Sequence, residues 1–174
     1  VTGSSSLDAS TALSLNNNIT LNNLATLTVP GTANLTLGGN VDGVGALRKN
    51  GTADLTLSGN NTYLGGTTLN VGRLLLGSNN ALGFGNLVAA GSTSLVSKSQ
   101  VTLNNNVTLL GAVSLLADGN NHLTLGGTVT GGGSLIKTGT GNLIVNGTNT
   151  YGGGTQLSAG ALVLGASGAL GSGL

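Results

Sequence analysis

The stretch GTGNLIVNGTNTYGGGTQLSAGALVLG, from Gly139 to Gly165, has an earlier counterpart, GTADLTLSGNNTYLGGTTLNVGRLLLG, from Gly51 to Gly77. Both consist almost entirely of Gly, Thr, Asn, Leu and Val. Triplets of aliphatic residues around a Thr are typical of short β-strands, and regularly spaced Gly and Asn are typical of the tight corners between strands. The two stretches therefore predict short strands joined by corners, in an arrangement that the chain contains twice.

The repeat extends over the whole chain. Tyr63 and Tyr151 are 88 positions apart, and residues 13–86 align with residues 101–174 at this offset without a gap, with about half of the positions identical. We therefore expect one continuous domain, 1–174, made of two 88-residue repeats, 1–88 and 89–174. We also expect the two tyrosines on the same side of the molecule, four turns of chain apart.

A finer period lies inside each repeat. Segments of the form apolar-x-Leu recur at successive offsets of 22, 20, 19 and 27 positions, and they begin at Leu13, Leu35, Leu55, Leu74, Val101, Leu123, Leu143 and Leu162. A period of this length with two or three short strands forms one coil of a parallel β-helix. A leucine-rich repeat is disfavoured because no helical apolar stripe is present, and a propeller because aromatic residues make up only 2% of the chain. We predict an all-β, single-domain parallel β-helix (β-solenoid) of about eight coils.

Strand geometry then predicts the core, because alternate residues of a strand point to opposite faces. The inward ladder is predicted to consist of Leu35, Leu37, Leu55, Leu57, Leu74, Leu76, Leu123, Leu125, Leu143, Val145, Leu162 and Leu164. Three residues break the alternation and predict a second apolar surface, covered by a loop or another chain: Leu75, Ile144 and Val163. Residues 77–100 are expected to be the one sizeable excursion from the coils.

Composition excludes several classes of protein. The chain is 39% hydrophobic, only 5% charged, carries a net charge of +1 and contains no Cys. An intrinsically disordered chain would be rich in charge and poor in aliphatic residues. Nothing forms a basic face for nucleic acid, and no apolar run is long enough for a transmembrane helix. We expect no nucleic-acid partner and no membrane insertion.

Four motifs occur at 139–173 and, more loosely, at 51–85, namely GTG-x-L, NTY-x-GGT, G-x-L-x-LG and ALG-x-G. In these motifs the sequence resembles the autotransporter-associated β-strand repeat of bacterial surface proteins. The resemblance implies a right-handed parallel β-helix, an extracellular or cell-surface location, and a role as a stalk or adhesin. No C-terminal stretch resembles the membrane barrel that translocates such passengers.

Groups able to perform acid–base chemistry are few. His122 is the single His, and the first repeat has Asn34 in its place, which favours a solvated turn residue over a ligand or general base. Asp42 and Asp54 are replaced by Thr130 and Asn142 in the second repeat. A repeated active site is therefore excluded, and we expect no catalytic, cofactor-binding or metal-binding residues. The cations are expected to keep the surface soluble, with an anionic partner as the alternative: Arg48, Lys49, Arg73, Lys98 and Lys137.

The two ends of the sequence, read from end to start, give GSGLVTGSSSL, which resembles the internal junction GFGNLVAAGSTSL. Either the chain is a window of a longer array, or copies stack head-to-tail. The predicted head-to-tail interface consists of Val1, Gly3, Leu7, Leu170 and Leu174.

These observations predict a non-enzymatic structural protein, a β-solenoid subunit or segment of an extracellular bacterial fibre or stalk that serves adhesion or surface scaffolding. Its partners would be copies of itself or adjacent repeats. The alternative is an adhesin module without self-assembly that binds surface glycans or a host surface along a lateral face or at 77–100. Ice binding is disfavoured because Thr26-Leu27-Thr28 is not repeated in register.

Overall fold

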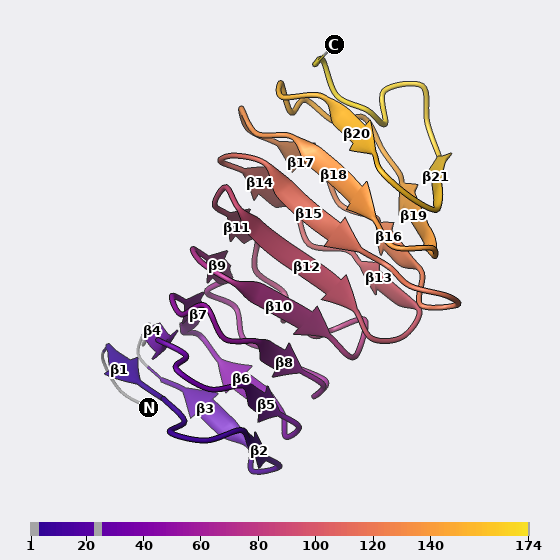
Figure 1. Cartoon of the computed structure of the whole chain (residues 1–174). Helices are drawn as coiled ribbons and strands as arrows, with labels where there is room; N and C mark the ends of the chain where they lie inside the picture. The colour runs from indigo at the N-terminus through magenta and orange to yellow at the C-terminus, as the bar shows by residue number, and fades with distance from the viewer. Residues whose placement is uncertain (1–3, 23–25, 174) are drawn as a thin grey trace.

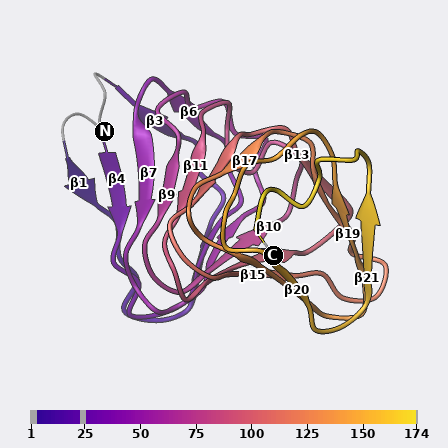
Figure 2. The same cartoon turned by 90° about the horizontal axis from the view of Figure 1, so that it is seen from above.

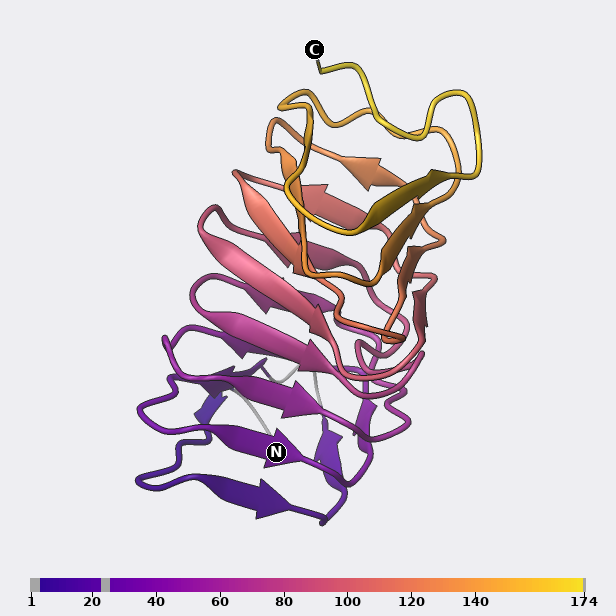
Figure 3. The same ribbon diagram turned by 45° about the vertical axis from the view of Figure 1, so that its right-hand side comes forward.

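The computed structural model describes residues 4–22 and 26–173, which form 21 short β-strands and no helix (Figure 1). All paired strands are parallel, and the chain winds upward through a stack of coils (Figure 3). The predicted all-β solenoid of about eight coils is therefore confirmed. Its right-handedness stays a prediction from the resemblance.

Two long sheets form two faces of the stack. The eight-stranded sheet contains β2 (Leu13–Leu15), β5 (Leu35–Leu37), β8 (Leu55–Leu57), β10 (Arg73–Leu76), β12 (Thr93–Ser97), β15 (Val113–Leu116), β18 (Leu135–Thr138) and β20 (Thr155–Leu157). The seven-stranded sheet contains β1 (Ser5–Ser6), β4 (Thr26–Val29), β7 (Ala46–Lys49), β9 (Thr67–Leu69), β11 (Leu87–Ala89), β14 (Val107–Leu109) and β17 (Val129–Thr130). Neighbours within each sheet come from successive coils.

The third face is a sheet only at its two ends. It starts with β3 (Ile19–Leu21) and β6 (Val41–Gly43), and it finishes with β13 (Val101–Leu103), β16 (Leu123–Leu125), β19 (Asn142–Val145) and β21 (Ala161–Leu164). Between them, segments 61–64 and 80–84 continue the stack through backbone hydrogen bonds. Thr62 N donates to Val41 O (2.8 Å), and Phe84 N donates to Tyr63 O (3.0 Å). Each coil thus has three sides, as the view in Figure 2 shows.

The 88-residue repeat does not equal a whole number of coils. Strands 88 positions apart lie in different sheets: β5 is in the eight-stranded sheet, whereas its counterpart β16 is on the third face. From β2 to its counterpart β13 the chain passes through thirteen segments, the eleven strands β2 to β12 and the segments 61–64 and 80–84. At three segments a coil, one repeat spans four coils and one further side.

The expectation that Tyr63 and Tyr151 share a side is therefore wrong. Tyr63 lies on the third face. Tyr151 lies in a segment that continues the seven-stranded face beyond β17, because Thr150 N donates to Val129 O (2.9 Å). The physical reason is the longest of the four offsets in the finer period. The stretch from Leu74 to Val101 contains one full coil plus one side, because β12 pairs with β10 before the chain turns to β13.

The predicted excursion at 77–100 is also wrong. This segment contains β11 and β12, which pair with strands both below and above them. Its apolar residues belong to the core: Ala81, Leu82 and Leu87 are fully buried. It is a coil of the solenoid, not a loop that leaves it. Its Gly/Asn-rich sequence is that of a corner, and only the pairing identifies the strands on either side.

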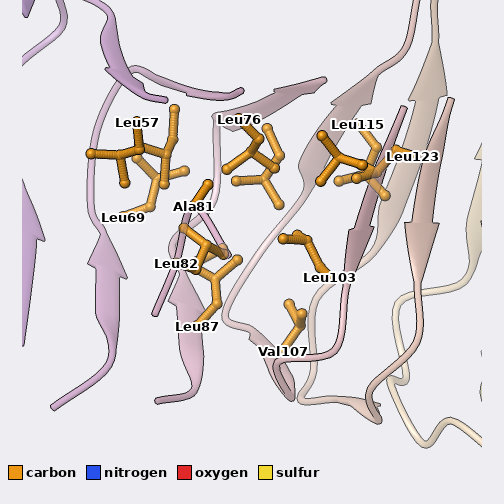
Figure 4. Packing of buried hydrophobic residues seen from close by; sticks show 14 of the residues in the cluster. Leu57, Leu69, Leu76, Ala81, Leu82, Leu87, Leu103, Val107, Leu115 and Leu123 are labelled. Carbon is orange, nitrogen blue, oxygen red and sulfur yellow. The ribbon is translucent and has the colours of Figure 1, made fainter. Parts of the chain in front are cut away.

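The core is a column of stacked aliphatic side chains that runs inside the three faces. Figure 4 shows side chains of β8, β10, β15 and β16, among them Leu57, Leu76, Leu115 and Leu123, converging on this interior. Ten residues of the predicted ladder are at most 2% exposed, namely Leu35, Leu37, Leu55, Leu57, Leu74, Leu76, Leu123, Leu125, Leu143 and Val145.

The last coil departs from the predicted ladder. Leu162 is half-buried and Leu164 is 50% exposed, although each pairs with a fully buried residue of β19, Leu143 and Val145. Both leucines lie in the same rows as the buried ones, but β21 ends its sheet. Burial in this fold requires a coil on each side, and β21 has one on one side only.

The three residues that broke the alternation have different surroundings. Leu75 pairs with Val96 of the next coil, and both are buried. Ile144 is half-buried and Val163 is 43% exposed. Each outward-facing apolar residue thus has one apolar neighbour on an adjacent coil, Val96 for Leu75 and Val163 for Ile144.

Candidate functional site

Candidate metal ligands do not cluster in the part of the chain that the structure describes. Nowhere among residues 4–22 and 26–173 do three or more His, Cys, Asp or Glu side chains gather as a metal site would require. The same residues contain no helix with the length and apolar character that crossing a membrane requires.

His122 acts as a corner residue. Its Nδ1 accepts a hydrogen bond from the backbone N of Asn142 on the next coil (3.0 Å). In the first repeat Asn34 Oδ1 accepts the equivalent bond from Asp54 N (3.0 Å). Because the imidazole nitrogen and the amide oxygen accept equivalent backbone hydrogen bonds, His122 is a structural acceptor that connects one coil to the next.

The carboxylates are dispersed along the stack. Asp54 Oδ2 lies 3.4 Å from Arg73 Nη1, an ion pair between neighbouring coils. Asp42 lies in β6 on the third face, whereas Asp54 precedes β8 of the eight-stranded sheet. The two side chains therefore do not converge on one face, as a pair of catalytic carboxylates must.

Two of the five cations lie inside the solenoid, so the expectation that all five are surface charges is wrong. Lys49 and Lys137, 88 positions apart, each have 0% exposure. Lys137 Nζ donates to the carbonyl oxygens of Thr138 (2.5 Å), Gly139 (2.7 Å) and Ala159 (3.3 Å), and Lys49 Nζ donates to Gly51 O. Each ammonium thus caps carbonyl groups that turn inward at a corner.

The sequence contained a signal for these interior lysines. Both follow Leu-x, in Leu47-Arg48-Lys49 and Leu135-Ile136-Lys137, so alternation places each lysine on the same side of its strand as a buried leucine. Burial lowers the pKa of both lysines, and the carboxylates of Asp54 and Asp118, respectively, act in the opposite direction.

Buried asparagines form a second set of interior ties. Asn61 Oδ1 accepts from Val41 N (2.8 Å) on the coil below, and its Nδ2 donates to Ala81 O (2.7 Å) on the coil above. In the second repeat, Asn149 makes the equivalent bonds to Val129 N (2.7 Å) and Ala169 O (2.7 Å). Each amide thereby joins three successive coils at a place where the backbone has no regular strand pairing.

The tyrosine of the NTY motif is interior as well. Tyr63 and Tyr151 are both fully buried, and each hydroxyl lies 2.5 Å from a threonine hydroxyl, that of Thr67 or Thr155. Burial raises the pKa of both phenols above the ordinary value of 10.0, while the hydrogen bond to Thr partly opposes the shift. The motif residues that carry the resemblance are therefore structural.

The ends of the stack expose apolar surface. In the last coils Leu157 is 51%, Val163 43% and Leu164 50% exposed, and in the first coil Leu13 is 45% exposed. Of the predicted head-to-tail interface, Leu7 packs on the core, and both Leu7 and Leu170 are half-buried. Val1, Gly3 and Leu174 lie outside the described residues.

Comparison with protein families gave two matches, at residues 47–76 and 135–164, to the passenger-associated-transport-repeat. Together they cover about a third of the chain. Neither a curated protein nor a solved structure matched. The matched segments contain both interior lysines, both buried tyrosines and both bridging asparagines, which are residues that tie the coils together.

A passenger repeat of this kind implies a surface or extracellular location and suggests a non-enzymatic structural module. Residues 47–76 and 135–164 are thus similar to the passenger-associated-transport-repeat, consistent with an autotransporter passenger repeat, and both segments are built into one β-solenoid.

Proposed function

We propose that the chain is a structural segment of an extracellular bacterial fibre or stalk that serves adhesion or surface scaffolding, and that copies of it stack head-to-tail. One observation carries the proposal. Leu157 and Leu164 of the last coils are 51% and 50% exposed, while the residues 88 positions earlier, Leu69 and Leu76, are fully buried by the coil above them. A further coil placed on β20 and β21 would bury these side chains in the same way.

The strand edge supports this occupant. β20 and β21 each end a sheet, so their outer backbone groups lack a ladder partner. An unpaired, apolar edge is a template for another strand of matching pattern, and the first coils of a second copy carry that pattern in Leu13 and Leu15. A contact between different surfaces of identical subunits continues indefinitely and produces a filament.

The geometry of the repeat gives the filament a symmetry. Because one repeat spans four coils and one side, each added repeat would turn equivalent features by about one third of a turn. At about 4.8 Å a coil, each repeat would advance the axis by roughly 21 Å. Two repeats per subunit would then place successive subunits roughly 42 Å apart.

The test is negative-stain electron microscopy together with sedimentation velocity of the purified 174-residue chain over a range of concentrations. The expected result is rods that lengthen with concentration. Leu164→Asp, at the exposed end, should stop the growth without unfolding the chain, whereas Leu110→Asp, on a lateral corner, should leave it unchanged. A wild-type chain that stays monomeric at high concentration would contradict the proposal and favour the adhesin module without self-assembly.

A further inference from the structure

A row of three exposed apolar side chains lies on the corner between the third face and the seven-stranded sheet. Val44, Leu64 and Phe84 are 43%, 56% and 63% exposed. Leu64 N donates to Gly43 O (3.0 Å) and Phe84 N donates to Tyr63 O (3.0 Å), which sets the three residues one above the other on successive coils. The row is about 10 Å long, at about 4.8 Å a coil.

The fold does not need this row. The second repeat has Gly132, Gly152 and Ser172 at the equivalent positions. A Cβ built on Gly132 or on Gly152 would meet nothing within 4 Å, so space for a side chain is present there and is unused. The equivalent corner of the second repeat therefore closes without apolar residues, and the first repeat carries them for a reason other than packing.

Neutral amides surround the aromatic end of the row. A pocket beside Phe84 is lined by Asn79, Asn80, Gly83, Phe84, Asn104 and Asn105. Asn105 is buried, and its Nδ2 donates to Gly83 O (3.0 Å) and Gly85 O (2.7 Å), which fixes the floor. None of the lining residues is charged.

Three of the lining amides, of which Asn79 and Asn104 are exposed and Asn80 is half-buried, keep unused hydrogen-bonding capacity. Asn79 Oδ1 accepts from Thr102 N (2.8 Å) and Asn80 Nδ2 donates to Asn60 Oδ1 (2.6 Å). This leaves the Nδ2 of Asn79, the Oδ1 of Asn80 and the whole side-chain amide of Asn104 without a partner among the described residues. Unused donors and acceptors thus lie beside an exposed ring.

We propose that this corner, defined by Val44, Leu64, Phe84, Asn79, Asn80 and Asn104, binds a neutral oligosaccharide. A pyranose ring has an apolar face of C–H groups that can stack on Phe84, and hydroxyl groups at its edge that can exchange hydrogen bonds with the asparagine amides. A second sugar unit of the oligosaccharide would lie along Leu64 and Val44.

The chemistry of the corner favours this ligand class over others. An anionic ligand would need a cation, and none lines the pocket. A protein strand would need an unpaired backbone edge, whereas the backbone here is bonded to the coils above and below. The site is independent of the stalk role, because it lies on a lateral corner and not at the ends of the stack.

The test is saturation-transfer-difference NMR of the wild-type chain with three neutral probes, cellotetraose, tetra-N-acetylchitotetraose and maltotetraose. At least one probe should receive saturation. Phe84→Ala should raise its Kd about tenfold, because the stacking partner is lost, and Asn104→Ala about threefold. Phe84→Tyr should retain binding, because the ring is kept.

Leu110→Ala is the matched control, because Leu110 has the same 63% exposure as Phe84 but lies on another corner. It should leave the Kd unchanged, and circular dichroism should show all variants folded. The proposal is overturned if no probe receives saturation from the wild-type chain, or if Phe84→Ala binds as wild type does. If no probe binds and Phe84→Ala changes the sedimentation of the chain, the proposal is also overturned, and the row is assigned to contact between copies.

Discussion

The two repeats have the same pattern but different surroundings. Leu76 and Leu164 occupy equivalent positions, and their exposures are 0% and 50%; for Leu69 and Leu157 the values are 0% and 51%. The polar ties, in contrast, are of the same kind in both repeats, with an interior lysine, a bridging asparagine and a buried tyrosine in each. Apolar burial in this fold therefore depends on the next coil, whereas the corner ties are supplied largely within the repeat.

The two repeats also present their motifs on different faces of the stack. Because each spans four coils and one side, the second presents its motif on a different face of the stack. A feature that occurs in one repeat only, such as the row ending at Phe84, is consequently found on one corner of the molecule. Repetition here maintains the core and leaves the surface free to vary.

The largest expected difference between the repeats comes from placing a charge on the ladder. Leu76→Asp would bury a carboxylate with no partner and should cost about 4 kcal/mol or prevent folding, whereas Leu164→Asp should cost at most about 1 kcal/mol, because water reaches it. Urea unfolding followed by circular dichroism measures both. Equal costs would mean that the end coil is packed as tightly as the middle.

The interior lysines should rank next. Lys137→Met leaves the carbonyl groups of Thr138, Gly139 and Ala159 without the ammonium and should cost about 2 kcal/mol, and Lys49→Met about 1 kcal/mol, since fewer carbonyls are involved. Lys98→Met, at an exposed position, serves as the control and should change little. A stability gain in Lys137→Met would show that desolvation of the ammonium outweighs its hydrogen bonds.

Removing the tyrosine hydroxyls should give a smaller difference in stability between the two repeats. Tyr63→Phe leaves the buried Thr67 hydroxyl without its partner and should cost about 1 kcal/mol. Tyr151→Phe should cost less, because Thr155 is half-buried and water can replace the lost bond. Thermal unfolding of the two single variants is the measurement, and the opposite order would contradict the burial argument.

Alkaline titration tests the ionisable groups of both repeats, and the sign of its effect on stability follows from the pKa shifts. The phenols of Tyr63 and Tyr151 have raised pKa values, so their contribution is complete below pH 10.0 and is lost as the pH rises above it. The ammonium groups of Lys49 and Lys137 have lowered pKa values, so between the folded value and 10.5 the unfolded chain binds more protons and stability rises with pH.

The melting temperature should therefore rise towards about pH 10 and fall beyond it. The double variant Tyr63→Phe/Tyr151→Phe should lose most of the fall, and Lys49→Met/Lys137→Met most of the rise. An unaltered profile in either double variant would assign the pH dependence to other groups.

The sequence by itself determined the local rules of this protein. Alternation within Leu-Thr-Leu segments identified which side chains point inward, and Gly and Asn marked the corners, because both signals depend on the conformation of a few consecutive residues. The match between Asn34 and His122 similarly predicted that the histidine is a corner residue, and it accepts the same backbone bond.

Tertiary structure alone decided how the coils are counted and what lies above each one. Nothing local distinguishes one long coil between Leu74 and Val101 from a coil plus a side; only the pairing of β10 with β12 does so. The burial of Leu76 and the exposure of Leu164 likewise depend on whether a further coil follows in the chain and packs on them. Which side chains point inward depends on the conformation of a short segment. Their burial, and the face on which a motif lies, depend on how the coils stack.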